Sequence, residues 1–257
     1  MTLKNNGENN PNLQYSIDGA SWSTYDTTIN IGRDQTLYLK GNNPDGWSHS
    51  STKYSNFTIT GDVYLSGNVM SLIDNGTNTK FYIPCGYCFY DLFFESTGIT
   101  SVSKNLLPAT TLADYCYHSM FVGCASLTQA PELPAKTLAI GCYESMFYNC
   151  SSLTTAPELS AISLTERCYV TMFAGCTSLT TAPALPATTL AESCYELMFS
   201  NCTSLAIIKI SYTGEYNDEY FNMWVYSVAE SGTFYYNGDQ TAQDFGLPSG
   251  WVTKRIN

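Results

Sequence analysis

Cysteines are the side chains of this chain best suited to chemistry, because thiolates act as nucleophiles, metal ligands and disulfide partners. The chain of 257 residues has ten of them. Eight fall into two series in which cysteine returns every 26 positions. A strict period of this kind indicates a structural repeat before it indicates a site. The two series are Cys116, Cys142, Cys168 and Cys194, and Cys124, Cys150, Cys176 and Cys202.

The spacing within a unit argues against disulfides. If a helix separates Cys116 from Cys124, their Cα atoms lie roughly 12 Å apart, whereas a disulfide needs about 4.4–6.8 Å. Cys116 and Cys142 would lie on neighbouring helices, and that separation is also too large for a disulfide. Cys124 and Cys150 could approach to about 5 Å near stacked strands, but each interior member of that series has two identical neighbours. We therefore interpret the eight as reduced, buried thiols that fill space, and we expect no disulfide and no metal site.

The remaining candidates for chemistry are sparse. Two further cysteines form the motif Cys85-Gly-Tyr-Cys88, but no βαβ pattern surrounds the pair and no second pair follows, so the context does not favour a redox or zinc role. The two histidines are His49 and His118, and we interpret His118 as a residue on a solvated helix face. The sequence shows no Ser/His/Asp arrangement and no phosphate-binding glycine loop, so we expect neither an enzyme nor a cofactor.

The repeat also predicts the elements of each unit. Leu112, Cys116 and Met120 are spaced i, i+4 and i+8, which predicts an amphipathic helix over about residues 112–122 and at the equivalent positions of the other units. The Leu-Thr segment that follows predicts a short strand, ended by a proline such as Pro131. Strands stack about 4.8 Å apart and helices pack about 8–10 Å apart. The stack should therefore curve, with strands inside and helices outside.

The signature M/F-F-x-x-C-x-S-L-T, followed by A-P and L-P, recurs in register over about residues 80–210. It resembles the BspA-type leucine-rich repeats of microbial surface proteins, of the kind found in gut bacteria and their phages. The resemblance implies a short leucine-rich-repeat solenoid with a role in adhesion or recognition, and it carries over no catalytic residue. The family's usual unit is a few residues shorter and typically has one cysteine, so the Cys116 series is a departure.

These patterns predict an α+β repeat protein in two parts. Residues 1–60 are rich in β-forming residues and turn signals, and we expect a small Ig-like β-sandwich similar to the modules that precede such repeats. Residues 61–257 should form the solenoid of 26-residue strand–helix units. Within it, 61–105 supply degenerate N-terminal rungs, 106–209 four regular repeats and 210–257 a C-terminal cap.

Charge and hydropathy restrict the partners. The net charge of −11 argues against nucleic acid and anionic membrane surfaces, because both bind clustered lysine and arginine. No apolar run approaches the ~20 residues of a membrane-spanning helix, so we expect no membrane insertion. The segment MTLKNNGENN lacks a basic and an apolar region, and we expect no signal peptide in this chain. Either an export signal has been removed, or the protein is made in a cytoplasm and exposed later.

The strand positions that should face solvent are the candidate ligand-binding residues. Small hydroxyl side chains there could present a flat polar surface to a protein or a glycan, although threonine is also a common strand residue without any such role. We expect a non-enzymatic recognition or adhesion protein at the cell surface. The alternative is a structural component of a phage particle, such as a fibre tip, capsid decoration or host-attachment component, whose partners are other virion proteins. The candidate residues are Thr128, Gln129, Thr154, Thr155, Thr180 and Thr181.

Overall fold

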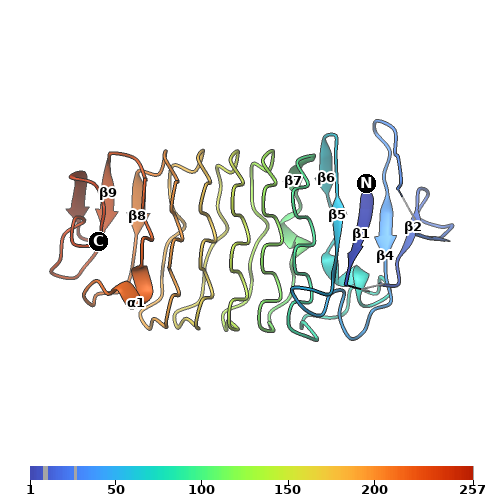
Figure 1. Cartoon of the computed structure of the whole chain (residues 1–257), viewed down its shortest axis with the longest axis horizontal. Coiled ribbons are helices and arrows are strands. Elements are labelled where there is room, and N and C mark those ends of the chain that lie inside the picture. The colour runs from blue at the N-terminus through green and yellow to red at the C-terminus, as the bar shows by residue number, and fades with distance from the viewer. Residues whose placement is uncertain (8–10, 26–27, 257) are drawn as a thin grey trace.

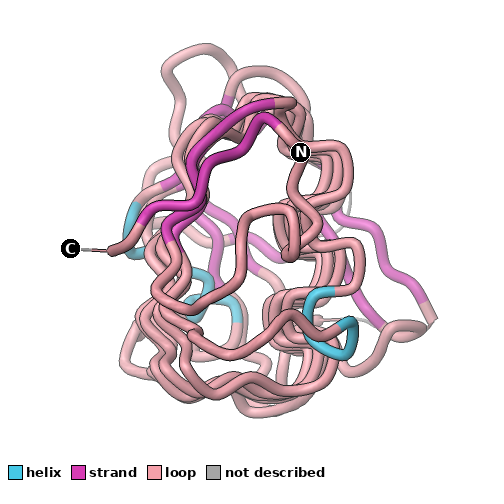
Figure 2. The backbone as a smooth tube through the Cα atoms, turned by 90° about the vertical axis from the view of Figure 1, so that its left-hand side faces the viewer, coloured by secondary structure: helices cyan, strands magenta, loops and turns pink. Residues whose placement is uncertain are grey.

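The computed structural model describes residues 1–7, 11–25 and 28–256. The chain winds into a stack of similar coils, each coil being one 26-residue turn around the core, with small sheets at both ends (Figure 1). Viewed along the stack, successive coils nearly superimpose (Figure 2). The two views together show a straight stack, so the expected arc is wrong. One hydrophobic core runs through it from Leu13 to Trp251.

Regular elements are short and lie mainly at the two ends. The N-terminal strands form a two-stranded antiparallel sheet and a three-stranded antiparallel sheet of order β3-β2-β4. Next along the chain, β6 pairs with β7 in parallel, and the C-terminal sheet has the parallel order β10-β9-β8. The bounds are β1 Thr2–Asn6, β2 Gln14–Ser16, β3 Ser23–Thr24, β4 Tyr38–Lys40, β5 Tyr54–Thr58, β6 Val63–Leu65, the 3₁₀ helix η1 Val69–Leu72, β7 Ile99–Val102, the 3₁₀ helix η2 Lys104–Leu106, β8 Ile207–Lys209, α1 Asp218–Phe221, β9 Ser231–Tyr235 and β10 Gly250–Lys254.

The helix expected over residues 112–122, and at its equivalents, is wrong. The segment is a run of turns in which every fourth residue has left-handed backbone geometry, with φ of 55° at Tyr115, 57° at Ser119 and 70° at Gly123. An α-helix needs φ near −63° at every residue. The i, i+4, i+8 spacing of buried residues fits a turn repeat of four residues as well as it fits a helix.

Backbone hydrogen bonds along these turns alternate between two directions. The N–H of Tyr117 donates to the carbonyl of Cys142 in the next coil at 3.1 Å. The N–H of Met120 donates back to the carbonyl of Tyr117 at 3.3 Å, which closes a turn within the coil. The same alternation recurs in the following coils, so this wall is held to its neighbours by a ladder of backbone bonds like that of a parallel sheet.

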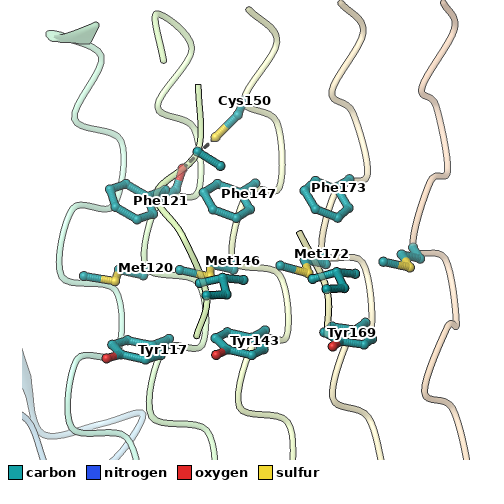
Figure 3. Packing of buried hydrophobic residues seen from close by; sticks show 14 of the residues in the cluster. Tyr117, Met120, Phe121, Tyr143, Met146, Phe147, Cys150, Tyr169, Met172 and Phe173 are labelled. Carbon is teal, nitrogen blue, oxygen red and sulfur yellow. Dashed lines mark hydrogen bonds between the residues drawn. The ribbon is translucent and has the colours of Figure 1, made fainter. Parts of the chain in front are cut away.

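The distance between coils explains why a helix does not form. The ring centroids of Phe121 and Phe147 lie 5.6 Å apart, and those of Phe147 and Phe173 lie 5.7 Å apart, with nearly parallel planes. Figure 3 shows these rings in one row, beside a methionine row and a tyrosine row. Packed helices need about 8–10 Å. The expected α+β leucine-rich-repeat solenoid, with one helix in each unit, is therefore wrong.

The N-terminal residues do not form the expected β-sandwich. Two small sheets take its place, and β5 continues the stack. The N–H of Phe57 donates to the carbonyl of Leu92 at 2.7 Å, and the N–H of Gly98 donates to the carbonyl of Ile59 at 3.1 Å. The ring of Phe57 stacks 6.1 Å from that of Phe93. Backbone bonds and core packing thus cross the boundary expected at residue 60.

Replacing Ser193 by glycine and by alanine tests the turn against the helix. Ser193 has φ of 53° and lies in the last repeat. We expect the free energy of unfolding of Ser193→Gly to exceed that of Ser193→Ala by about 1 kcal/mol, because glycine adopts left-handed geometry without steric cost. Urea unfolding of the two variants measures the difference. In a helix the order would reverse, since glycine there costs about 0.5–1 kcal/mol relative to alanine.

Candidate functional site

The six predicted binding residues lie in one exposed row, which we call the threonine row. A β-bridge joins Gln129 to Thr155, and another joins Thr181 to Ile207 in β8. The hydroxyls of Thr128 and Thr154 donate to carbonyls of the preceding coil at 3.2 and 3.1 Å. Within the described residues, the side chains of Gln129, Thr155 and Thr181 have no hydrogen-bond partner. The structure therefore places the row in solvent, and its role in binding stays a prediction.

A second cluster was missed by sequence reasoning and surrounds Glu144. Glu144 is buried, and its two carboxylate oxygens accept hydrogen bonds from Arg167 Nε at 3.1 Å and Arg167 Nη2 at 2.7 Å. Such a bidentate pair fixes both side chains. His118 Nδ1 lies 4.0 Å from Glu144 Oε2 and has no hydrogen-bond partner among the described residues. The His118 side chain is only 19% exposed, so the solvated position expected for it is wrong.

Four partly exposed tyrosines extend this cluster, and we call Tyr54, Tyr87, Tyr90 and Tyr115 the tyrosine cluster. Tyr87 stacks on Tyr115 with centroids 4.9 Å apart, and Tyr90 stacks on His118 at 5.2 Å. Tyr54 meets Tyr90 edge to face at 5.0 Å. The rings thus form one contiguous aromatic surface that borders the Glu144–Arg167 pair.

A glycine gives Tyr115 its place in the cluster. In the next coil the residue one repeat after Tyr115 is Gly141, whose φ is 55°. A Cβ at Gly141 would clash with the Tyr115 ring. The missing side chain therefore lets the ring lie over the next coil, toward the position of Arg167.

Burial sets the protonation of the groups around the rings. It lowers the pKa of His118, and the nearby Glu144 carboxylate only partly opposes this effect. The hydrogen bond with Glu144 raises the pKa of Arg167. Burial raises the pKa of Asp91 to about 7. Burial also raises the pKa of Tyr90 to about 12, and the negative charge of Asp91 adds to this increase. Near neutral pH the surface therefore offers a neutral imidazole at His118 and a protonated phenol at Tyr90.

The thiols of the Cys124 series take part in the coil-to-coil contacts. Cys150 Sγ donates to the carbonyl of Phe121 at 3.1 Å (Figure 3), and the other three thiols make the equivalent bond at 3.0–3.2 Å. Both series are fully buried, as predicted. Burial raises the pKa of Cys124 and Cys202 to about 12, so these thiols keep the proton that they donate. Size and a weak S–H donor together explain cysteine at this position.

Comparison with known protein families, with curated proteins and with solved structures finds no match for this chain. The resemblance to BspA-type repeats therefore stays a prediction. Among the described helices, none is long and apolar enough to cross a bilayer. The part of the chain that the structure describes contains no group of three histidine, cysteine or acidic side chains arranged to hold a metal ion.

The Asp91 carboxyl should make stability fall with pH. Its side chain is buried, and the folded pKa of about 7 lies above the value of about 3.9 expected in an unfolded chain. Between about pH 4 and about pH 7 the folded state therefore holds a proton that the unfolded chain has released. The stability that this proton contributes is lost as pH rises through that range. Asp91→Asn keeps a neutral side chain that tolerates the φ of 53° at this position. We expect the free energy of unfolding of the variant, relative to that of wild type, to be higher at pH 8 than at pH 5.

Urea unfolding of both proteins at pH 5 and pH 8 measures this effect. Titration of His118 and the other groups is common to both proteins, so the difference between them isolates Asp91. An equal stability difference at the two pH values would contradict a raised pKa at Asp91.

Proposed function

We propose that this chain is a non-enzymatic recognition protein that binds a protein or glycan ligand outside the cell, with its stack of coils as a rigid support. The observation that carries the proposal is the tyrosine cluster with its bordering Arg167. The rings of Tyr87 and Tyr115 are partly exposed and held by mutual stacking at 4.9 Å. Pre-ordered aromatic rings supply large contact areas at low entropic cost.

The composition of the surface also supports binding. Tyrosine and arginine are enriched among the residues that dominate the energy of protein interfaces. Glu144 fixes the guanidinium of Arg167, whose side chain is 36% exposed. The threonine row is the second candidate surface, because several coils present equivalent polar side chains in solvent. The coil stack thus holds both surfaces on backbone that is bonded to its neighbours.

A glycan array and a binding assay on intact host cells test the proposal with three proteins. We expect wild type to bind at least one ligand. Tyr115→Ala should weaken that binding by about 30-fold or more, the effect of truncating a central aromatic residue. The double variant Thr155→Lys, Thr181→Lys should bind like wild type. The melting temperature of each variant serves as the control for folding.

The outcomes separate the two surfaces. Loss of binding in the lysine variant alone would assign the ligand to the threonine row and not to the tyrosine cluster. An absence of binding by folded wild-type protein on both the array and the cells would contradict a recognition function.

The phage-particle function remains the second candidate, and the cysteines favour it. The ten cysteines of the described chain are thiols, and nine of them are buried. Thiols persist in proteins that fold in a reducing cytoplasm, where virion proteins are made. Genes for capsid or tail proteins next to this gene would support the virion role. An export signal at the start of the native gene would contradict it.

A further inference from the structure

The Cys85–Cys88 pair lies at the N-terminal end of the coil stack, where the chain of residues 46–48 crosses it. The N–H of Ser48 donates to the carbonyl of Cys88 at 2.8 Å. In return, Cys85 Sγ donates to the carbonyl of Ser48 at 3.4 Å. Both cysteines are thus held against the same short segment.

The two sulfur atoms meet at Gly46. A Cβ at Gly46, whose φ is 128°, would clash with Cys85 Sγ and would lie 3.5 Å from Cys88 Sγ. The missing side chain leaves room for both sulfurs. The cysteines are three positions apart in a turn, where Cα atoms lie within about 7 Å. That separation reaches the range in which a disulfide forms.

The two thiols differ in exposure and in acidity. Cys85 is partly exposed, whereas Cys88 and the eight repeat cysteines are fully buried. The neighbouring Cys88 thiol lowers the pKa of the Cys85 thiol, while burial raises the pKa of the Cys88 thiol well above its usual value. An accessible, more acidic thiol beside a buried one is the arrangement of an attacking and a resolving cysteine.

We propose that Cys85 and Cys88 form a redox-active dithiol that reduces small-molecule disulfides and is itself converted to an intramolecular disulfide. This activity is independent of the recognition function proposed above. Sequence reasoning set the pair aside because no βαβ pattern surrounds it. The turn and Gly46 supply the proximity that such a pattern supplies elsewhere.

The reaction proceeds in two exchanges. The Cys85 thiol loses its proton to solvent, and its sulfur attacks one sulfur of the incoming disulfide, which breaks the S–S bond and releases one thiolate. The Cys88 thiol then gives its proton to solvent and its sulfur attacks Cys85 Sγ, which breaks the mixed disulfide and releases the second thiolate. Both thiolates take up protons from solvent. One small-molecule disulfide becomes two thiols, and two protein thiols become one disulfide.

The test uses the full chain, reduced and then freed of reductant, with oxidised glutathione as the probe. After an acid quench, free thiols are alkylated under denaturing conditions and the peptides are analysed by mass spectrometry. We expect wild type to lose two of its ten alkylation sites and to yield a peptide with a Cys85–Cys88 disulfide. Cys88→Ser should accumulate one glutathione on Cys85. Cys85→Ser should take up at least 10-fold less glutathione in the same time.

Circular dichroism of each protein before oxidation confirms that it is folded. The proposal is overturned if folded wild type keeps all ten thiols, or if the lost thiols are scattered over the repeat cysteines. It is also overturned if folded Cys88→Ser forms no mixed disulfide. A wild-type protein that keeps all ten thiols overturns the proposal whether or not either variant folds.

Discussion

Successive coils lie close enough for their backbones to hydrogen-bond and for identical rings to stack at 5.4–5.7 Å along the phenylalanine row. Each buried position must therefore accept the same side chain above and below it, so phenylalanine, tyrosine, methionine and cysteine recur every 26 residues. The same spacing requires left-handed turns, which cost roughly 1–2 kcal/mol at each residue other than glycine. Core burial and the bonds between coils offset that cost.

The sequence period predicts the stack and its buried residues but not the local backbone. Leu112, Cys116 and Met120 match a helical period of 3.6 over so short a span that a four-residue turn repeat is indistinguishable from it. Gly123, the residue just past the expected helix, is in fact the last of three left-handed positions in its coil. Exposure of the threonine row was predicted correctly. The Glu144 cluster was not predicted, because its contacts join residues of different coils.

The proposed binding surface around Glu144 lies at positions where the repeat does not keep one residue type. One repeat position, outside the ring rows, holds His118, Glu144 and Val170 in successive coils. Exact stacking of the core brings them side by side, so unlike side chains from different coils form a surface. Asp114 shows the same effect, since its carboxylate accepts a hydrogen bond from the N–H of Ile140 in the next coil at 3.1 Å.

A double-mutant cycle on the phenylalanine row tests the central claim most directly. The cycle uses Phe121→Leu and Phe147→Leu, and a matched cycle uses Phe121→Leu and Phe199→Leu, whose rings are separated by two others. The stacked coils predict a coupling of about 0.5–1.5 kcal/mol for the adjacent pair and almost none for the distant pair. No coupling between Phe121 and Phe147, or equal coupling in both cycles, would contradict coils held together by direct ring stacking.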